Sequence, residues 1–185
     1  MRINYESDAF SGKISPLSLV YDGDRVEPRG QVSGRTLTMS LHIPTVDESL
    51  AVFIHELGHI VDIQHLRKGT LSADPSKSFY ALSWQSSSEK IPSATIADFV
   101  SGYALSNQYE DFAETFAFYV LHNETFRKRA ESNESLRRKY EFMRDEVFSE
   151  EAFEGTDFGT ETVAAYFWDG TKLPFDRKKY LFFIR

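Results

Sequence analysis

Cysteine is absent from this chain of 185 residues, and its absence excludes disulfide bonds and thiolate metal ligands. Long apolar runs are also absent, because no stretch approaches the ~20 apolar residues that a helix needs to cross a bilayer. Residues 1–6 lack the apolar segment of a signal peptide, and residues 180–185 form a strand-like apolar run that stops abruptly. We therefore expect no membrane span, and we expect a domain cut from a longer precursor that is secreted or extracytoplasmic.

Positive charge is scarce relative to negative charge. The chain has 21 Lys and Arg residues against 28 Asp and Glu residues, so it lacks the basic face that nucleic-acid binding requires. Hydrophobic residues make up 41% of the chain and aromatic residues 15%, which is enough for a packed core. We expect one monomeric domain over 1–185. Its parts would be strands and a central helix in 1–66, a helical part in 67–148, and in 149–185 a closing segment or the start of a truncated region.

Alternation and turn signals predict a small sheet in the first 44 residues. An apolar run at 17–21 precedes a hairpin-type turn signal at 22–24. Residues 36–43 alternate cleanly, and one face of this predicted strand carries Leu37, Met39, Leu41 and Ile43. Because this strand immediately precedes the central helix, it is a candidate to edge a cleft where an extended peptide adds as a further strand, and an ordinary sheet strand is the alternative.

Capping and periodicity signals predict the helices. Residues 45–48 have the form of a capping box, and residues 67–69 supply two basic residues and a glycine that suit a helix C-terminus. Asp74 and Pro75 start a short helix, and Asn107 begins another that runs to His122. The charged pattern of 123–148 is helical, and 162–167 is a predicted closing strand. The fold class is therefore α+β.

The central helix contains the motif His55-Glu56-Leu57-Gly58-His59. Positions i and i+4 of a helix lie on one face, about one turn apart, so both imidazoles can bind a single metal ion. Zinc suits such ligands, and a catalytic zinc site has three protein ligands and one open position. The glutamate after the first histidine can take a proton from a water molecule at that position. The alternative is a buried amphipathic helix with two unrelated histidines.

Three side chains compete to be the third ligand. His65 lies ten residues after His55, the spacing of the extended metzincin motif, but that motif needs glycine where this chain has Asp62. In a continuous helix His65 also lies about 9 Å beyond the second histidine along the axis. Asp157 lacks the spacing that follows the aspartate ligand of other zinc peptidases. Glu110 stands in the first turn of a buried helix, where the helix dipole favours an ionised carboxylate, and it is the predicted ligand.

Two segments together resemble the catalytic domain of anthrax lethal factor and its relatives. The likeness covers about residues 36–122, and its residues are His55-Glu56-Leu57-Gly58-His59, Tyr103, Asn107 and Tyr109-Glu110-Asp111-Phe112-Ala113-Glu114. These relatives are gluzincin-type peptidases and include the Pro-Pro endopeptidases. The resemblance implies a zincin-like fold, a third metal ligand at Glu110 and a tyrosine, Tyr103, that stabilises the oxyanion. The N-terminal strands and the Arg/Lys-rich C-terminal region have no counterpart, so no substrate is implied.

The predicted activity is zinc-dependent hydrolysis of peptide bonds in a peptide or protein substrate. Glu56 is the predicted general base. Tyr103 is the predicted oxyanion donor, and a structural tyrosine of the core is the alternative. Asn107 is predicted to cap the helix that presents the third ligand. Glu114 and Asp62 are predicted to orient a ligating imidazole, and for both of them a structural salt bridge is the alternative. The alternative function is a non-catalytic zinc-binding interaction domain or a pseudoenzyme with a zincin fold.

Overall fold

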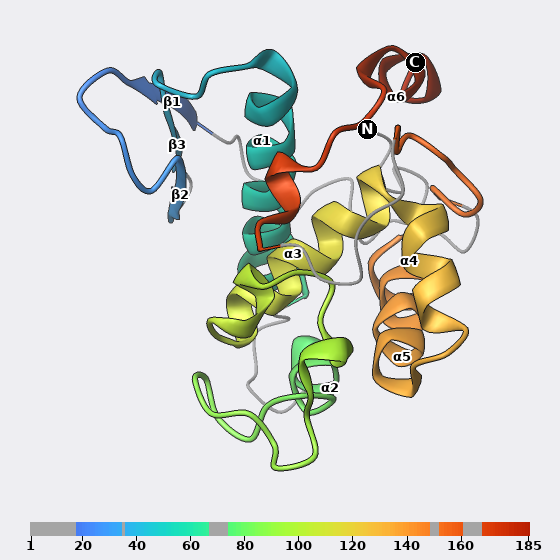
Figure 1. Ribbon diagram of the computed structural model, residues 1–185. Coiled ribbons are helices and arrows are strands. Elements are labelled where there is room, and N and C mark those ends of the chain that lie inside the picture. Colours follow the sequence, from blue (N-terminus) through green and yellow to red (C-terminus); the bar gives the residue numbers. More distant parts are fainter. Residues whose placement is uncertain (1–17, 35, 67–73, 149–151, 161–167) are drawn as a thin grey trace.

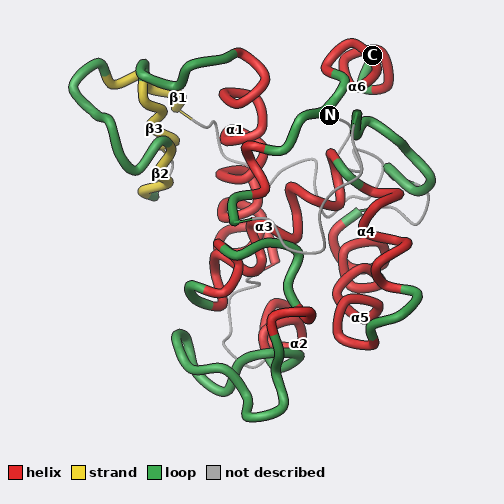
Figure 2. Tube along the Cα trace, viewed as in Figure 1, coloured by secondary structure: helices red, strands yellow, loops and turns green. Residues whose placement is uncertain are grey.

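The computed structural model describes residues 18–34, 36–66, 74–148, 152–160 and 168–185. Within these ranges the fold is α+β, with a small sheet beside a larger group of helices (Figures 1 and 2). The strands are β1 (Ser18–Asp22), β2 (Gly30–Ser33) and β3 (Thr36–Ser40). The α-helices are α1 (Val46–Ile60), α2 (Ser76–Tyr80), α3 (Gln108–Leu121), α4 (Asn123–Ala130), α5 (Glu134–Phe142) and α6 (Arg177–Phe183). In the described part of the chain, no helix combines the length and the apolarity that a membrane crossing needs.

The sheet has the strand order β1-β3-β2. β3 pairs parallel with β1 and antiparallel with β2. The hairpin-type signal at 22–24 forms a turn, in which the Asp22 carboxylate accepts the Asp24 N–H at 2.9 Å and the Arg25 N–H at 3.2 Å. The turn does not join two paired strands. After β1 the chain crosses to the other edge of the sheet, where β2 pairs with β3. The expectation that 36–43 edges a cleft is therefore wrong, since β3 is central and β2 lies at the edge.

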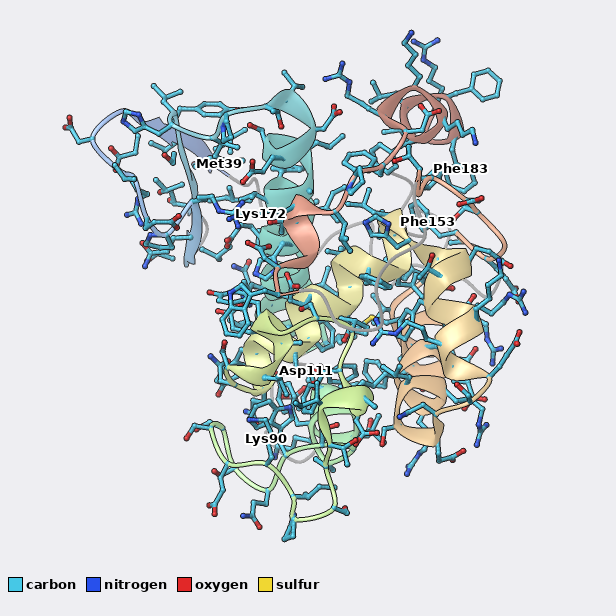
Figure 3. The ribbon with its side chains drawn as sticks, viewed as in Figure 1. Met39, Lys90, Asp111, Phe153, Lys172 and Phe183 are labelled. Carbon is cyan, nitrogen blue, oxygen red and sulfur yellow. The ribbon has the colours of Figure 1, made fainter. Side chains whose placement is uncertain are left out.

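One face of the sheet packs against α1. Leu37 and Met39 of β3 are buried, and they form an apolar cluster with Val52 and Ile60 of α1. Figure 3 shows Met39 on the sheet beside that helix. The predicted alternation ends early, because β3 stops at Ser40 and the side chain of Leu41 is 61% exposed. The sheet thus covers one side of the helix that carries the histidine motif.

α1 begins where the capping signal predicts. The Thr45 hydroxyl accepts the Glu48 N–H at 3.1 Å. The Glu48 carboxylate does not complete the box, because it pairs with Arg29 instead. After Ile60 the helix widens into a π-helical turn, Val61–Leu66, and residues 67–69, where the C-terminal signals fall, lie outside the described residues.

α3 lies at the centre of the helical part and is buried along almost its whole length. It packs across α1, and α4 and α5 pack side by side next to its far end (Figure 1). The Asn107 side chain accepts the N–H groups of Tyr109 and Glu110 at 2.9 and 3.1 Å, so the predicted cap is present. Aromatic rings of α3 dominate the main core, and they are Phe112, Phe116, Phe118 and Tyr119.

The C-terminal end differs from the sequence prediction. The run 180–185 was expected to be strand-like, but most of it belongs to α6. The Asp176 carboxylate accepts the N–H groups of Lys178 and Lys179 at 2.9 and 3.1 Å and thereby caps this helix. The predicted closing strand at 162–167 lies outside the described residues. The prediction for 123–148 holds, since α4, α5 and the π-helical turn Met143–Val147 make this stretch helical.

A buried histidine marks the junction of α3 and α4. His122 is 3% exposed, and within the described part of the chain neither ring nitrogen has a hydrogen-bond partner. Its ring packs against Phe118 with centroids 5.0 Å apart. Burial disfavours the imidazolium and lowers the pKa of His122 from 6.5 to about 4.

His122 is expected to make the protein less stable in acid. Below pH 6.5 the unfolded chain binds a proton at this ring that the folded chain does not bind until about pH 4, so the free energy of unfolding falls as the pH falls through this window. The expected loss is about 3 kcal/mol relative to His122→Leu, which lacks this group. Urea unfolding at several pH values measures the difference between the two proteins.

The exposed His42 provides the matched control for this experiment. His42→Gln is expected to keep the pH dependence of the wild type. Parallel curves for His122→Leu and the wild type between pH 4 and 6.5 would show that the ring is not buried in its neutral form.

Candidate metal centre

The two histidines of the motif lie one turn apart on the inner side of α1. Their ring centroids are 5.0 Å apart. His55 is buried, and His59 is partly exposed. The helical spacing therefore turns both rings toward the neighbouring helix, as the sequence predicts.

Glu110 of α3 meets both rings. Its Oε2 atom lies 3.1 Å from His55 Nε2 and 3.3 Å from His59 Nε2. One nitrogen of each histidine and one oxygen of Glu110 all lie within 4.8 Å of one another. The structure thus brings together the three side chains that the sequence predicts as metal ligands.

The close crossing of α1 and α3 makes this meeting feasible. A Cβ atom added to Gly58 would lie 2.9 Å from the Cα atom of Ala113, closer than real Cβ atoms approach. Glycine at the centre of the motif and alanine opposite it therefore let the two backbones come together. The Glu110 side chain of α3 can then reach both histidine rings of α1.

The histidines and carboxylates of the cluster shift one another's pKa values. Burial disfavours the protonated ring of His55, but hydrogen bonds to Glu110 and Glu114 outweigh it and raise its pKa to about 10. Burial also disfavours the charged form of Glu110, but the two histidines lower its pKa to about 2. The two carboxylates therefore favour a positive charge beside them. A divalent cation supplies such a charge, and two imidazoles with one carboxylate are a ligand set that zinc prefers.

Glu114 holds the other side of the His55 ring. Its Oε1 atom lies 2.8 Å from His55 Nδ1. Its Oε2 atom accepts the Ser101 hydroxyl and, at 2.9 Å, the Gly170 N–H. This carboxylate is 1% exposed, and a Cβ atom added to Gly170 would lie 2.8 Å from Oε2. Glu114 thus fixes His55 with Nε2 directed at Glu110.

Loss of the Glu114 charge is expected to weaken zinc binding. Glu114→Gln keeps the side-chain shape, but the neutral amide accepts the His55 N–H less strongly, and changes at such supporting residues typically cost 10–100-fold in metal affinity. Competition with a chromogenic zinc chelator measures the effect. Glu124→Gln on the surface of α4 is the matched control and is expected to bind zinc like the wild type. Equal affinities for the two variants would contradict this supporting role.

Glu56 lies in a cavity that is also lined by one of the three predicted ligands, His55. The cavity has a volume of about 240 Å³, and its lining includes His55, Glu56, Tyr103 and Gly30. Glu56 is 5% exposed, and burial raises the pKa of its carboxyl group. A Cβ atom added to Gly30 would lie 2.5 Å from Glu56 Oε1. The strand β2 therefore passes directly against this carboxylate, and a side chain at position 30 would force the Glu56 side chain to shift.

Tyr103 stands on the same cavity, in a short 3₁₀ helix (Tyr103–Leu105). Its ring centroid lies 6.0 Å from that of His55. Burial and the nearby carboxylates of Glu110 and Glu114 raise the pKa of Tyr103 to about 12. The phenol therefore keeps its proton at neutral pH and is a hydrogen-bond donor.

Asp62 lies three residues beyond His59 and is not one of the three converging side chains. The Asp62 carboxylate accepts the Tyr80 hydroxyl at 2.5 Å, and among the described residues no hydrogen bond joins it to an imidazole. The prediction that Asp62 orients a ligating ring is therefore not reflected in the hydrogen bonds. The side chain of His65 lies outside the described residues, and Asp157 is exposed and separate from the cluster.

Sequence reasoning missed the residues that enclose the site. Arg29 bridges two carboxylates, Glu48 at the start of α1 and Asp169 near the C-terminal end, and also donates to the Thr171 hydroxyl at 3.0 Å. Gly30, Ser101 and Gly170 were missed as well. Only Gly30 gave a local signal, because the stretch Pro28-Arg29-Gly30 marks a break in the pattern.

We compared the chain with protein-family models, with curated proteins and with solved structures, and found no match in any of them. The functional conclusion therefore depends on the geometry of the site.

Proposed function

We propose that this chain is a zinc-dependent endopeptidase of the zincin type. The observation that carries the proposal is the convergence of His55, His59 and Glu110, with the Glu56 carboxylate beside them in a cavity. Two histidines and one glutamate leave a coordination position open, as in catalytic zinc sites. The same residues carry the resemblance to the lethal factor and Pro-Pro endopeptidase group, and the proposed activity is the one that this group has.

His55, His59 and Glu110 would hold the ion. A bound zinc ion supplies a Lewis acid that polarises a carbonyl group and lowers the pKa of water. The donor set fits this role, because Glu110 is ionised and Glu114 supports His55 from behind.

Glu56 would move the proton. A water molecule attacks the scissile carbonyl carbon, and the Glu56 carboxylate accepts the proton that the water loses. When the C–N bond breaks, Glu56 returns this proton to the leaving amine nitrogen. The raised pKa of Glu56 suits both steps, because the carboxylate must accept a proton and then give it up. Tyr103 would donate a hydrogen bond to the oxyanion.

The edge strand β2 favours an extended peptide as the substrate. In the antiparallel pair, the Ser40 N–H donates to the Arg29 carbonyl oxygen at 2.8 Å. Because hydrogen-bonded and non-hydrogen-bonded positions alternate, the backbone groups of Gly30 and Val32 are directed away from β3. Gly30 lies against Glu56, so a peptide strand that added to this edge would bring its backbone to the general base.

Zinc titration and peptide cleavage test the proposal together. The wild type is expected to bind one zinc ion per chain, to cleave members of a diverse peptide pool, and to lose cleavage when a chelator removes the metal. His59→Ala is expected to lose both properties, and the exposed His42→Gln neither. Zinc binding without cleavage of any peptide would support the non-catalytic alternative, and absence of zinc binding would contradict both.

A further inference from the structure

A second, larger cavity lies next to the proposed active site. Its volume is about 450 Å³, within the range of small-ligand pockets. Its lining includes Asp62, Asp74, Lys77, Tyr80, Trp84 and Tyr109. None of them takes part in the proposed chemistry, so the mechanism leaves this cavity without a role.

This cavity continues the active site along both helices that form it. Asp62 follows His59 by three residues and His55 by seven, so these three side chains share one face of the continuous helix that α1 and its π-turn form. On the other side, Tyr109 immediately precedes Glu110 in α3. The cavity around Glu56 contacts His55. The larger cavity begins at Asp62, about one helical turn beyond His59. A peptide that crosses the metal ligands along α1 would therefore pass both.

Asp62 supplies an unpartnered acceptor at the wall of the cavity. The residue is 2% exposed, and one of its carboxylate oxygens accepts the Tyr80 hydroxyl. Within the described part of the chain the other oxygen, Oδ1, has no hydrogen-bond partner. Buried carboxylate oxygens are normally paired, because leaving one without a donor is costly. The neutral Ser76 hydroxyl is a donor near this carboxylate, and a cationic group is a stronger donor than a hydroxyl.

Aromatic rings line the same cavity. The rings of Tyr80 and Tyr109 meet edge to face with centroids 5.7 Å apart, and Trp84 stands beside them in the lining. Such rings attract cations over their faces, and the Trp84 ring already has Lys90 Nζ at 4.9 Å from its centroid. Asp74 adds a second carboxylate, so among the described residues the lining has two acidic groups and one ammonium group, that of Lys77.

We infer that this cavity receives the side chain of a lysine or arginine residue of the peptide substrate, with Asp62 as the residue that selects it. The inference rests on the proposed peptidase function. The aliphatic part of the lysine or arginine side chain would pack against the tyrosine rings. Its ammonium or guanidinium group would donate a hydrogen bond to Asp62 Oδ1.

Paired peptides test this inference. In a cleavage profile of the wild type, a basic residue is expected at one fixed position relative to the scissile bond. A peptide with arginine there is expected to have a kcat/KM at least about tenfold above the same peptide with citrulline, which keeps the shape and lacks the charge. Asp62→Asn is expected to bring this ratio close to one. The matched control is Glu134→Gln, an exposed acid on α5 whose partner is Arg137, and it is expected to keep the wild-type ratio.

Asp74→Asn and Tyr109→Leu provide the test if Asp62→Asn does not fold, since both residues are less buried and each is expected to lower the ratio. A wild-type profile with no basic preference, or a ratio unaffected by all these variants, would overturn the inference and leave the proposed function intact.

Binding to the inactive protein separates the two ideas. The fluorescence of Trp84 reports occupancy of the cavity, and Trp168→Phe removes the second indole of the chain. Acetyl-arginine amide is expected to change this signal at lower concentration than acetyl-citrulline amide in Glu56→Gln protein. If this preference is found while the wild type cleaves no peptide, the proposed function is contradicted and the cationic site is kept. Equal binding of the two amides would overturn the site.

Discussion

Replacement of Glu56 by glutamine is expected to lower kcat/KM for peptide cleavage by about 10²–10⁴-fold, the usual contribution of a general base. Glutamine keeps the length of the side chain and its place against Gly30, but the amide cannot accept the proton of the attacking water. Zinc affinity is expected to change little, because Glu56 is not among the three converging ligands. The combination of retained metal and lost cleavage distinguishes this role from a structural one.

The measurement is the initial rate of cleavage of a peptide found in the profile, with zinc content determined in the same sample. Glu89→Gln makes the same chemical change at an exposed position and is expected to keep the wild-type rate. If Glu56→Gln with a full complement of zinc cleaved the peptide as fast as the wild type, Glu56 would not be the base.

The second large effect is expected at Lys139, which is buried completely inside the helical part. Its ammonium group donates to both oxygens of Asp111, at 2.9 and 2.7 Å, and to the Asp98 carbonyl oxygen at 2.9 Å. The Trp84 indole N–H donates to Asp111 at 2.9 Å as well, and Phe99 lies against the ammonium with its ring centroid 4.1 Å away. Figure 3 shows Asp111 in the interior, on the helix that presents Glu110.

Lys139→Met is expected to lower the free energy of unfolding by about 3–5 kcal/mol, because it leaves the Asp111 carboxylate buried without its cation. Urea unfolding at neutral pH measures this loss. The double variant Lys139→Met with Asp111→Leu is expected to be less destabilised than the sum of the two single variants, since it leaves no unpaired charge.

Lys128→Met is the matched control, because Lys128 is an exposed lysine that pairs loosely with Glu124 at 3.6 Å. It is expected to unfold like the wild type. A Lys139→Met variant within about 1 kcal/mol of the wild type would mean that the Lys139–Asp111 pair contributes no more than a surface pair does.

Local signals were sufficient to predict the helices that carry the site. Thr45 and Asn107 mark the starts of α1 and α3, and both caps are present in the structure. The i, i+4 spacing of the histidines gives their shared face directly from helix geometry. The position of Glu110 in the first turn of α3 could also be predicted, because the capping residue Asn107 lies three residues before it.

Contacts between residues far apart in the sequence could not be predicted in the same way. The pairing of β1 with β3, and the edge position of β2, depend on how the chain returns to the sheet and not on any short stretch. Gly170 contacts Glu114 across 56 positions of sequence, and no periodic pattern encodes such a contact. The error at α6 was different in kind, because Asp176 followed by basic residues is a local capping signal that the apolar run obscured.

The hydrogen bond from the Gly170 N–H to Glu114 has a consequence for biosynthesis. A ribosome releases the histidine motif and Glu110 long before it releases Gly170, so the nascent chain presents these side chains while the support behind His55 is still incomplete. The support behind the His55 ring would then be complete only after Gly170 has emerged and its N–H has reached the Glu114 carboxylate.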